Sequence, residues 1–530
     1  MERVIHECRR DKILCSADDA VGLIRDGQTI VIGGFVGTSN PEALTTRLEQ
    51  KFLAEGSPRG LTLVYAAGQG DRGRRGANHM AHAGLIRRVI GGHFALAPAL
   101  CKLIIGNQIE AYNFPQGVIC QLFRDIAAHR PGCLTHIGLD TFMDPIHGGG
   151  RLNPRTTEQL IERVELCGRT WLFYHAFPVN IALIRATAAD PFGNLVTDLE
   201  PLIGETLPIV QAVHNNGGIV IAQVNELLDA PVLPQHVRVP GVLVDRIVLA
   251  GAGCTEQTFD EKLNMTYCSA LPNGLCLEKL LPPMELDERR IIASRALDEL
   301  PEGAIVNLGI GMPEGIARMA AERGMLDRFT LTVESGQIGG IPAGGLSFGA
   351  SVYPQAVVDE PAQFDFYDGG GLNFAALGAG EIDAGGNVNV SIFGSRLAGV
   401  GGFISITQTA PKLVFCGTLT AGGLVVDVDD GKLIIVTEGK IKKFVRQVQQ
   451  LSFSGERACR LGQSVLYVTE RAVFRLTPRG LELIEIAPGI DLERDVIARM
   501  EFEPIVSPDL KPMPAHVFEA VEKKLMAKAV

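Results

Sequence analysis

The chain contains one pattern twice. Residues 27–44 read GQTIVIGGFVGTSNPEAL, and residues 303–317 read GAIVNLGIGMPEGIA. Each copy starts with a glycine and a short β-branched segment, passes through a glycine-rich turn with Pro-Glu, and continues into a helical pattern. The repeat therefore predicts two strand–turn–helix units in two related α/β halves.

The ends of the two helices can also be predicted. Asn40 is placed to cap the first helix. Pro41 and Pro313 suit the first helical position, where the N–H that proline lacks has no partner to lose. Gly56 and Gly324 mark the points where the two helices are expected to end.

A second pair of segments follows in the same order. Residues 190–195 read DPFGNL, and residues 383–388 read DAGGNV. The interval before the first copy is longer than the interval before the second, which predicts an insertion near residues 100–170.

The segment between the halves has the composition of a linker. Residues 269–290 read SALPNGLCLEKLLPPMELDERR, with a Pro-Asn-Gly turn, a Pro-Pro pair and a charged end. We therefore expect an N-terminal domain over 1–275, a linker over 276–290 and a C-terminal domain over 291–530.

Several candidate strands are short apolar runs, among them Leu61–Ala66, Gly218–Val224 and Lys412–Phe415. Such runs are typical of strands that are buried on both faces of largely parallel sheets. After Val425 the sequence alternates more, which favours an antiparallel portion. The predicted fold class is two related open α/β domains with largely parallel sheets.

Composition limits the possible functions. Of 530 residues 46% are hydrophobic and 21% charged, as in globular proteins. A net charge of −11 without a long basic tract argues against nucleic acid as a partner. There is no apolar run of membrane-spanning length and no signal-like N-terminus. The 11 cysteines form no CxxC pair and suggest a reducing compartment. We expect a cytoplasmic enzyme.

Three short motifs give only weak signals. Gly68–Gly73 reads GQGDRG, but no acidic residue lies about 20 positions on, where a dinucleotide site would place one. Gly345–Gly349 reads GLSFG, but its flanks do not predict the strand and helix of a nucleophile elbow. His79 and His82 have no HExxH motif or obvious third metal ligand. Plain turns and packing are favoured for all three.

The segment 328–340, RFTLTVESGQIGG, is more informative. Its alternating first half predicts a strand, and Glu334 lies at the carboxyl end of that strand. Ligands of α/β sheets bind beyond this end. Glu334 is therefore a candidate catalytic carboxylate, although an exposed loop glutamate beside turn glycines fits the segment as well.

Two further segments could stabilise an oxyanion. GSRLAGVGGF, residues 394–403, offers backbone N–H groups, and NFPQGV, residues 113–118, offers the side-chain amide of Gln116. A tight turn between strands and an ordinary surface turn are the alternatives.

Taken together and in this order, the motifs resemble family I coenzyme A transferases in the fused form, in which an alpha-like half precedes a beta-like half. The C-terminal YVTERAVFRLTPRGLELIEIAPGID is most similar to the acetate/propionate and acyl-CoA:acetoacetate branch. The resemblance rests on GGFVGTSNPEAL, PQG at 115–117, ADPFGNL at 189–195, NLGIGMP at 307–313, Glu334-Ser335-Gly336, LGAGEIDAGGNVNV at 377–390 and GVGGF at 399–403.

The sequence departs from this family at two places. Many relatives have Ser-Glu-Asn-Gly where this chain has Val333-Glu334-Ser335-Gly336, and Gly-Met-Gly-Gly-Ala where it has GVGGF. The glutamate and the glycines remain, so the departures concern acyl preference more than reaction type.

The resemblance implies reversible, ping-pong transfer of CoA from a short-chain acyl-CoA to acetate, propionate or a 3-keto acid. Glu334 would be the nucleophile and would carry a glutamyl-CoA thioester. Gln116 and the N–H groups of Gly401 and Gly402 would stabilise the oxyanion. CoA is a substrate, and no metal or redox cofactor is implied. The residues expected to line the CoA groove are Asn307, Gly309, Ile310 and Gly311.

Three other functions stay open at this point: a CoA-thioester hydrolase on the same fold, a sensor that binds CoA esters without turnover, and an NAD-dependent oxidoreductase. The expected partners are acyl-CoA and short-chain carboxylates, without nucleic acid or membrane. A homodimer or homotetramer is expected from the resemblance and from the frequency of symmetric enzymes.

Overall fold

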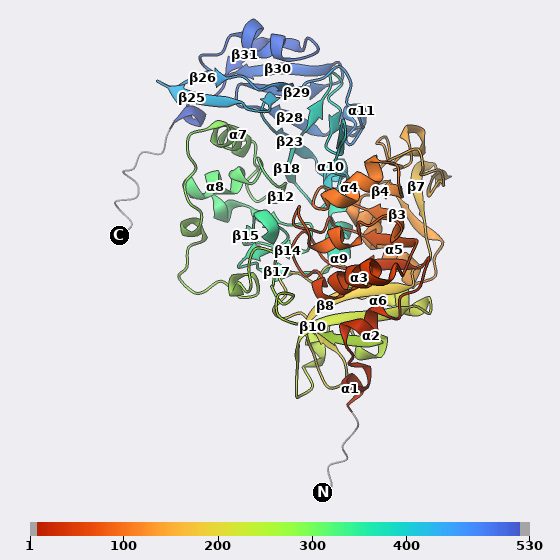
Figure 1. Cartoon of the computed structure of the whole chain (residues 1–530). Helices are drawn as coiled ribbons and strands as arrows, with labels where there is room; N and C mark the ends of the chain where they lie inside the picture. The colour runs from red at the N-terminus through yellow and green to blue at the C-terminus, as the bar shows by residue number, and fades with distance from the viewer. Residues whose placement is uncertain (1–7, 520–530) are drawn as a thin grey trace. The chain divides into compact units, whose positions relative to one another are not determined.

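The computed structural model describes residues 8–519 (Figure 1). The chain packs as two compact units. The first contains segments from both halves of the sequence, whereas the second is built only from segments after Leu271. The first unit comprises the chain up to Leu271, Val333–Asp368 and Ser395–Ser405, and the second comprises Pro272–Thr332, Gly369–Gly394 and the chain from Ile406 onward. The predicted domains, 1–275 and 291–530 with a linker over 276–290, follow the sequence repeat and not these packing units. They stay a prediction.

The main sheet of the first unit has the order β4-β3-β2-β1-β8-β10-β11, and all neighbouring strands in it run parallel. A short strand, β9, pairs antiparallel with β8. Strands β1, β2 and β8 are buried along their whole length, as the apolar runs predict for a sheet covered on both faces. The strands are β1 (Thr29–Ile32), β2 (Leu61–Tyr65), β3 (Ile86–Gly91), β4 (Glu110–Asn113), β8 (Ile181–Ala189), β9 (Leu195–Val196), β10 (Ile219–Leu227) and β11 (Arg246–Leu249).

A small antiparallel sheet with the order β5-β7-β6 falls where the sequence predicts an insertion. Its strands are β5 (Gly132–Thr135), β6 (Ile161–Leu166) and β7 (Arg169–His175). Two short antiparallel pairs follow Glu334: β14 (Gln337–Ile338) with β17 (Ala356–Val357), and β15 (Ile341–Pro342) with β16 (Ser351–Val352). The helices of this unit are α1 (Arg9–Ile13), α2 (Ala17–Val21), α3 (Glu42–Glu55), α4 (Pro98–Ile105), α5 (Gln116–Ala127), α6 (Thr206–Asn215) and α9 (Glu360–Asp368).

Helix α3 ends as predicted but begins differently. Gly56 ends it in the left-handed conformation, with φ of 67°. Pro41, not Asn40, occupies the N-cap position, and no side chain caps the helix. The Asn40 amide instead donates to the carbonyls of Val36 at 3.2 Å and Thr38 at 3.3 Å. The predicted cap is therefore wrong, because the side chain closes the preceding loop.

The main sheet of the second unit continues from parallel into antiparallel pairing. Its order is β13-β12-β18-β23-β28-β29-β30-β31, parallel from β13 to β28, antiparallel from β28 to β30, and parallel again between β30 and β31. This confirms the antiparallel portion expected after Val425. The strands are β12 (Ile305–Leu308), β13 (Thr330–Thr332), β18 (Phe374–Gly378), β23 (Lys412–Cys416), β28 (Ser464–Val468), β29 (Ala472–Thr477), β30 (Gly480–Ile486) and β31 (Ile505–Pro512).

Short strands and helices complete the description. The short strands are β19 (Glu381–Ile382), β20 (Val388–Asn389), β21 (Ile392–Phe393), β22 (Arg396–Leu397), β24 (Thr420–Ala421), β25 (Val425–Asp429), β26 (Lys432–Thr437) and β27 (Ile441–Lys442). The remaining helices are α7 (Glu288–Leu297), α8 (Gly315–Glu322), α10 (Phe403–Thr409) and α11 (Gly455–Leu461). Within residues 8–519, no helix has the length and apolar character needed to cross a bilayer.

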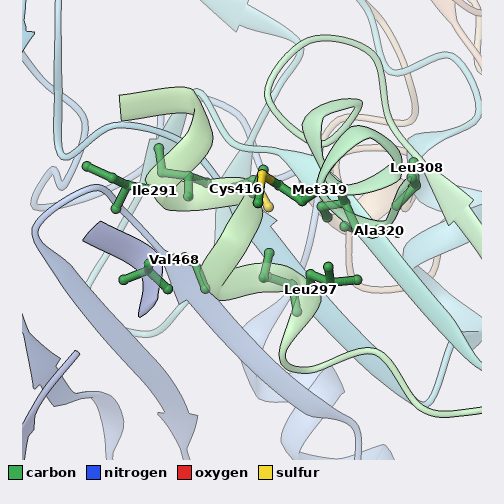
Figure 2. Packing of buried hydrophobic residues seen from close by; sticks show 14 of the residues in the cluster. Ile291, Leu297, Leu308, Met319, Ala320, Cys416 and Val468 are labelled. Carbon is green, nitrogen blue, oxygen red and sulfur yellow. The ribbon is translucent and has the colours of Figure 1, made fainter. Parts of the chain in front are cut away.

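The core of the second unit lies between two helices and the sheet. Figure 2 shows Ile291 and Leu297 of α7 beside Met319 of α8, with Cys416 of β23 and Val468 of β28 in the same cluster. All of these side chains are at most 2% exposed. This packing fixes β12 and the loop that follows it.

The two units share a topology. The strand orders β2-β1-β8-β10-β11 and β13-β12-β18-β23-β28 match one another, and both runs are parallel. The glycine-rich turns of the sequence repeat leave the carboxyl ends of β1 and β12, which lie inside their sheets. The predicted fold class, two related α/β domains with largely parallel sheets, is confirmed.

Candidate active site

Glu334 lies in a tight turn that begins directly after β13. The N–H of Val333 donates to the carbonyl of Gln337, and the N–H of Gly336 donates to the carbonyl of Val333, each at 3.0 Å. Gly336 has φ of +116°, and a Cβ there would lie 2.0 Å from the carbonyl oxygen of Val358. Only glycine fits this position. The turn holds the half-buried Glu334 side chain on a fixed backbone.

Buried polar side chains anchor this turn. The hydroxyl of Ser335 lies 2.8 Å from the carbonyl of Gly349 and 2.7 Å from Oε1 of Gln337. Nε2 of Gln337 donates to the carbonyl of Pro201 at 2.8 Å. Ser335 and Gln337 are both completely buried. Ser335, one of the departures from the family pattern, thus supports the turn by bonding to the protein itself.

Gln116 is the first residue of α5 and is only 2% exposed. This burial excludes the ordinary surface turn that the sequence left as the alternative. The N–H of Gln116 donates to the carbonyl of Gly401 at 3.0 Å, and its side-chain Nε2 donates to Oε1 of Glu360 at 2.6 Å. The structure therefore brings Gln116 and the GVGGF loop together.

The two glycines predicted as N–H donors differ in their bonding. The N–H of Gly401 donates to the carbonyl of Gly92 at 2.7 Å, so this amide is already engaged. Among residues 8–519, no acceptor is found for the N–H of Gly402. The neighbouring Val400 N–H donates to Oδ1 of Asn113 at 3.0 Å, which fixes the loop. Of the two, Gly402 has the amide available to a ligand.

Glu360 belongs to a buried pair of carboxyl groups that the sequence analysis missed. Glu360 is completely buried at the start of α9, and Glu205, which faces it before α6, is 1% exposed. Within the part of the chain that the structure describes, Oε2 of Glu360 and Oε1 of Glu205 have no hydrogen-bond partner. Burial raises the pKa of Glu205 to about 7. Burial, with the charge of Glu205 second, raises the pKa of Glu360 well above its ordinary range. The pair therefore retains a proton near neutral pH.

This pair fixes the orientation of the Gln116 amide. The Glu360 carboxyl also accepts from the thiol of Cys120 at 3.4 Å, and the N–H of Glu360 donates to the carbonyl of Gly204 at 3.1 Å. Because Oε1 of Glu360 accepts one of the two Nε2 hydrogens of Gln116, the other remains for a ligand. No local motif signals Glu360 or Glu205. Only the fold brings them to Gln116.

The residues predicted to line the CoA groove lie together in the second unit. Asn307 is in β12 and 1% exposed, and Gly309, Ile310 and Gly311 form the loop after that strand. Gly309 is tied to the sheet, since its N–H donates to the carbonyl of Ala376 at 2.8 Å. Ile310 is 50% exposed. The loop thus presents an apolar side chain to solvent, with a glycine on each side of it. Glu334, Gln116, Gly401 and Gly402 all belong to the first unit.

In the GQGDRG segment, the side chain of Asp71 bonds to backbone N–H groups of the same loop. Oδ1 of Asp71 accepts the N–H groups of Gly73, Arg74 and Arg75 at 2.8, 2.8 and 3.0 Å. Successive N–H groups of this kind are what binds a phosphate in a glycine-rich loop. Here a carboxylate of the chain already occupies them, which argues against dinucleotide binding.

The GLSFG segment has no nucleophile elbow. Ser347 lies in a short 3₁₀ turn, Gly345–Ser347, and not between a strand and a helix. Its hydroxyl lies 2.8 Å from that of Thr258 and 2.7 Å from Oε2 of Glu261. Ser347 is therefore a structural residue.

The two histidines pair with glutamates of α3. His79 lies 2.7 Å from Glu42 and 2.6 Å from Glu49, and His82 lies 2.6 Å from the other oxygen of Glu49. Over the described range 8–519, no group of His, Cys, Asp and Glu side chains is arranged to hold a metal ion. Both histidines serve packing.

Comparisons with known proteins agree with this picture. The family model described as Coenzyme A transferase matches residues 15–250. The chain is 43% identical to acetate CoA-transferase YdiF of Escherichia coli K12, over 95% of this chain and 94% of that protein. It is 41% identical to the caffeate CoA-transferase of Acetobacterium woodii, over 95% of this chain and 97% of that protein.

A solved structure matches equally well. The crystal structure of the acyl-CoA transferase YdiF of E. coli O157:H7, in a thioester complex with CoA, has a TM-score of 0.90 and 41% identity over 96% of each chain. The chain belongs to the coenzyme A transferase family. This confirms the family resemblance and the enzyme class inferred from the motifs.

Proposed function

We propose that the protein transfers CoA reversibly from a short-chain acyl-CoA to a free carboxylate such as acetate, propionate or a 3-keto acid. The observation that carries this proposal is the anchored turn at Glu334, which holds a carboxylate directly beyond a strand. The relative that was crystallised as a thioester complex with CoA supports the same chemistry.

The Glu334 carboxylate attacks the carbonyl carbon of the thioester, and the CoA thiolate leaves. A glutamate with the ordinary pKa of about 4.3 is ionised at neutral pH, so the attack needs no general base. The thiolate then attacks the glutamyl carbonyl of the mixed anhydride and releases the first carboxylic acid as its anion. A glutamyl-CoA thioester remains. A second carboxylate attacks this thioester and reverses the sequence, which gives ping-pong kinetics.

Each attack places negative charge on a carbonyl oxygen. The free hydrogen of Gln116 Nε2 and the N–H of Gly402 are the donors for this oxyanion. Glu360 is a positioning residue, because it holds Nε2 of Gln116 in one orientation. Loss of one such donor typically costs about 3–4 kcal/mol of transition-state stabilisation. Asn307 of β12 and the loop after this strand, with Gly309, Ile310 and Gly311, bind the CoA moiety.

The reaction requires neither a metal nor a redox cofactor from the protein. Water must be kept from the anhydride, because hydrolysis would turn the transferase into a thioesterase. A homodimer or homotetramer in the cytoplasm completes the proposal. Light scattering coupled to size-exclusion chromatography measures the oligomeric state.

Intact-protein mass spectrometry tests the proposal. The protein is mixed with acetyl-CoA or acetoacetyl-CoA without an acceptor and then digested for peptide mapping. We expect a CoA-sized adduct on the peptide that contains Glu334, and none in Glu334→Gln, which keeps the shape but not the nucleophile. An adduct that persists in this variant contradicts the role of Glu334. Release of free CoA without an adduct identifies a hydrolase, and CoA-ester binding without either identifies a sensor.

A further inference from the structure

The first unit contains a cavity whose lining residues have no role in the proposed function. It has a volume of about 590 Å³. Its walls come from the loop that precedes the 3₁₀ helix Gly76–Met80, from α4 and from β22. Volumes of this size are typical of sites for small organic molecules. A single inorganic phosphate would leave most of the space empty.

The charge of the cavity is one-sided. Arg72, Lys102 and Arg396 line it, and none of the lining residues in the described part of the chain carries a carboxylate. Among residues 8–519, none of these three cations has an ion-pair partner. In a chain of net charge −11, three unpaired cations around one hollow repel one another unless an anion joins them. The cavity therefore suits a ligand with more than one negative charge.

Apolar side chains form the other part of the lining. Pro98 and Ile105 lie one above the other on α4, and Leu397 comes from β22. Apolar surface next to cations fits an organic anion, because its uncharged part has a place to bury. A nucleoside phosphate combines the two properties.

The walls of the cavity are fixed by backbone bonds. The N–H groups of Phe94 and Ala95 both donate to the carbonyl of Ala398, at 2.7 and 3.3 Å. The N–H of Arg72 donates to the carbonyl of Leu96 at 2.9 Å, and Arg72 has φ of +62°. A non-glycine residue holds this left-handed conformation only where its surroundings enforce it, and such residues cluster at functional sites. These bonds fix the backbone that carries the cationic side chains.

We infer that this cavity binds a nucleoside phosphate, with the phosphates against Arg72, Lys102 and Arg396 and the uncharged part against Pro98, Ile105 and Leu397. This chemistry has two sources. One is the 3′-phospho-ADP end of CoA, which rests on the proposed function, and the other is a free nucleotide, which does not.

Calorimetric titration of the full-length protein with adenosine 3′,5′-bisphosphate tests the inference. We expect saturable binding that weakens with salt, because the site acts through charge. Lys102→Glu and Arg396→Glu, each in an exposed side chain, should weaken binding at least tenfold. Arg87→Glu, an equal change of charge on an exposed residue of β3 outside the lining, should stay within twofold of the wild type. Unchanged binding in both pocket variants, or no binding to the wild type, overturns the inference.

Steady-state kinetics separates the two sources. If the probe competes with acyl-CoA, and the pocket variants raise the KM for acyl-CoA while kcat is kept, the ligand is the nucleotide end of CoA. If the probe binds with the same variant pattern and KM does not change, the ligand is a separate nucleotide. Both outcomes support the site. A wild type that binds the probe but transfers no CoA contradicts the proposed function alone. Normal CoA transfer, together with pocket variants that bind the probe as tightly as the wild type, contradicts this inference alone.

Discussion

The two copies of the repeated glycine-rich loop have opposite environments. The first copy, which precedes α3, is buried throughout residues 31–40, and Ser39 donates to Oε2 of Glu200 at 2.8 Å. Its Phe35 packs in a cluster with Val333, next to Glu334 in the chain. The second copy, after β12, leaves Ile310 50% exposed. One loop has become part of a core that supports the catalytic turn, whereas the other remains open to a ligand.

The second repeated segment shows the opposite behaviour, because both copies form the same turn. Oδ1 of Asp190 accepts the N–H of Asn194 at 3.0 Å, and Oδ1 of Asp383 accepts that of Asn387 at 3.1 Å. Each asparagine amide donates back to the other oxygen of its aspartate, at 3.1 and 3.0 Å. The two halves thus share the structural turns at Asp190 and Asp383. They differ in the glycine-rich loops, of which the second is the proposed ligand-binding loop.

Replacing Glu334 gives the largest expected effect and the sharpest separation of function from stability. Glu334→Gln should lower kcat/KM by about four orders of magnitude or more, because the nucleophile is lost. The melting temperature should stay within about 2 °C of the wild type, since the turn is held by Ser335, Gly336 and Gln337. Transfer assays and thermal denaturation measure both. Substantial remaining turnover would contradict the assignment.

Replacing Gln116 or its positioning partner should act mainly on kcat. Gln116→Ala removes a proposed oxyanion donor and should reduce kcat about 100- to 1,000-fold, with a smaller change in KM. Glu360→Ala removes the acceptor oxygen and frees the Gln116 amide to rotate, and a smaller reduction of kcat is expected. Asp368→Ala, at another carboxyl of α9 whose pKa is raised by burial, is the matched control. If Glu360→Ala behaves like this control while Gln116→Ala is impaired, Glu360 is not a positioning residue.

Matched glycine substitutions test the contrast between the two loops. A Cβ at Gly37 would lie 2.4 Å from the carbonyl oxygen of Leu346 and 2.9 Å from Cβ of Phe259, whereas a Cβ at Gly311 would meet no atom of residues 8–519 within 4 Å. Gly37→Ala should cost about 3 kcal/mol of unfolding free energy. Gly311→Ala should cost about 1–2 kcal/mol from its backbone conformation alone, with φ of +93°. Chemical denaturation compares them, and equal losses would contradict the contrast.

The buried acid pair predicts a pH dependence of stability. Because the folded protein raises the pKa of Glu205 to about 7, the folded state binds more protons than the unfolded state between the ordinary glutamate pKa and that value. The protonated pair therefore contributes to the free energy of unfolding at low pH, and this contribution is lost as the pH rises toward 7. Glu205→Gln, which imitates the protonated acid, should gain melting temperature relative to the wild type between pH 5 and pH 8. A constant difference over this range would contradict the shared proton.

Local patterns predicted the strands, the repeat and the candidate nucleophile, because each depends on residues close in sequence. The cap at Asn40 was wrong because the same side chain can bond to the loop carbonyls of Val36 and Thr38. Glu360 could not be found this way, since its role comes from a bond to Gln116 that spans 244 positions. The engagement of the Gly401 amide by Gly92 is equally non-local. Proximity in the fold, and not residue type, decides these roles.

The smallest expected change in stability comes from a substitution in the exposed loop after β12. It is compared with a substitution in the buried strand itself. Ile310 is half exposed, so Ile310→Ala should cost less than about 0.5 kcal/mol of stability. If the loop binds CoA, the loss of this apolar contact should raise the KM for acyl-CoA several-fold and leave kcat unchanged. Leu308, 4% exposed in β12, is the control, because Leu308→Ala should cost about 2–5 kcal/mol of stability. An unaltered KM in Ile310→Ala would mean that the second loop, although exposed, is not a binding surface.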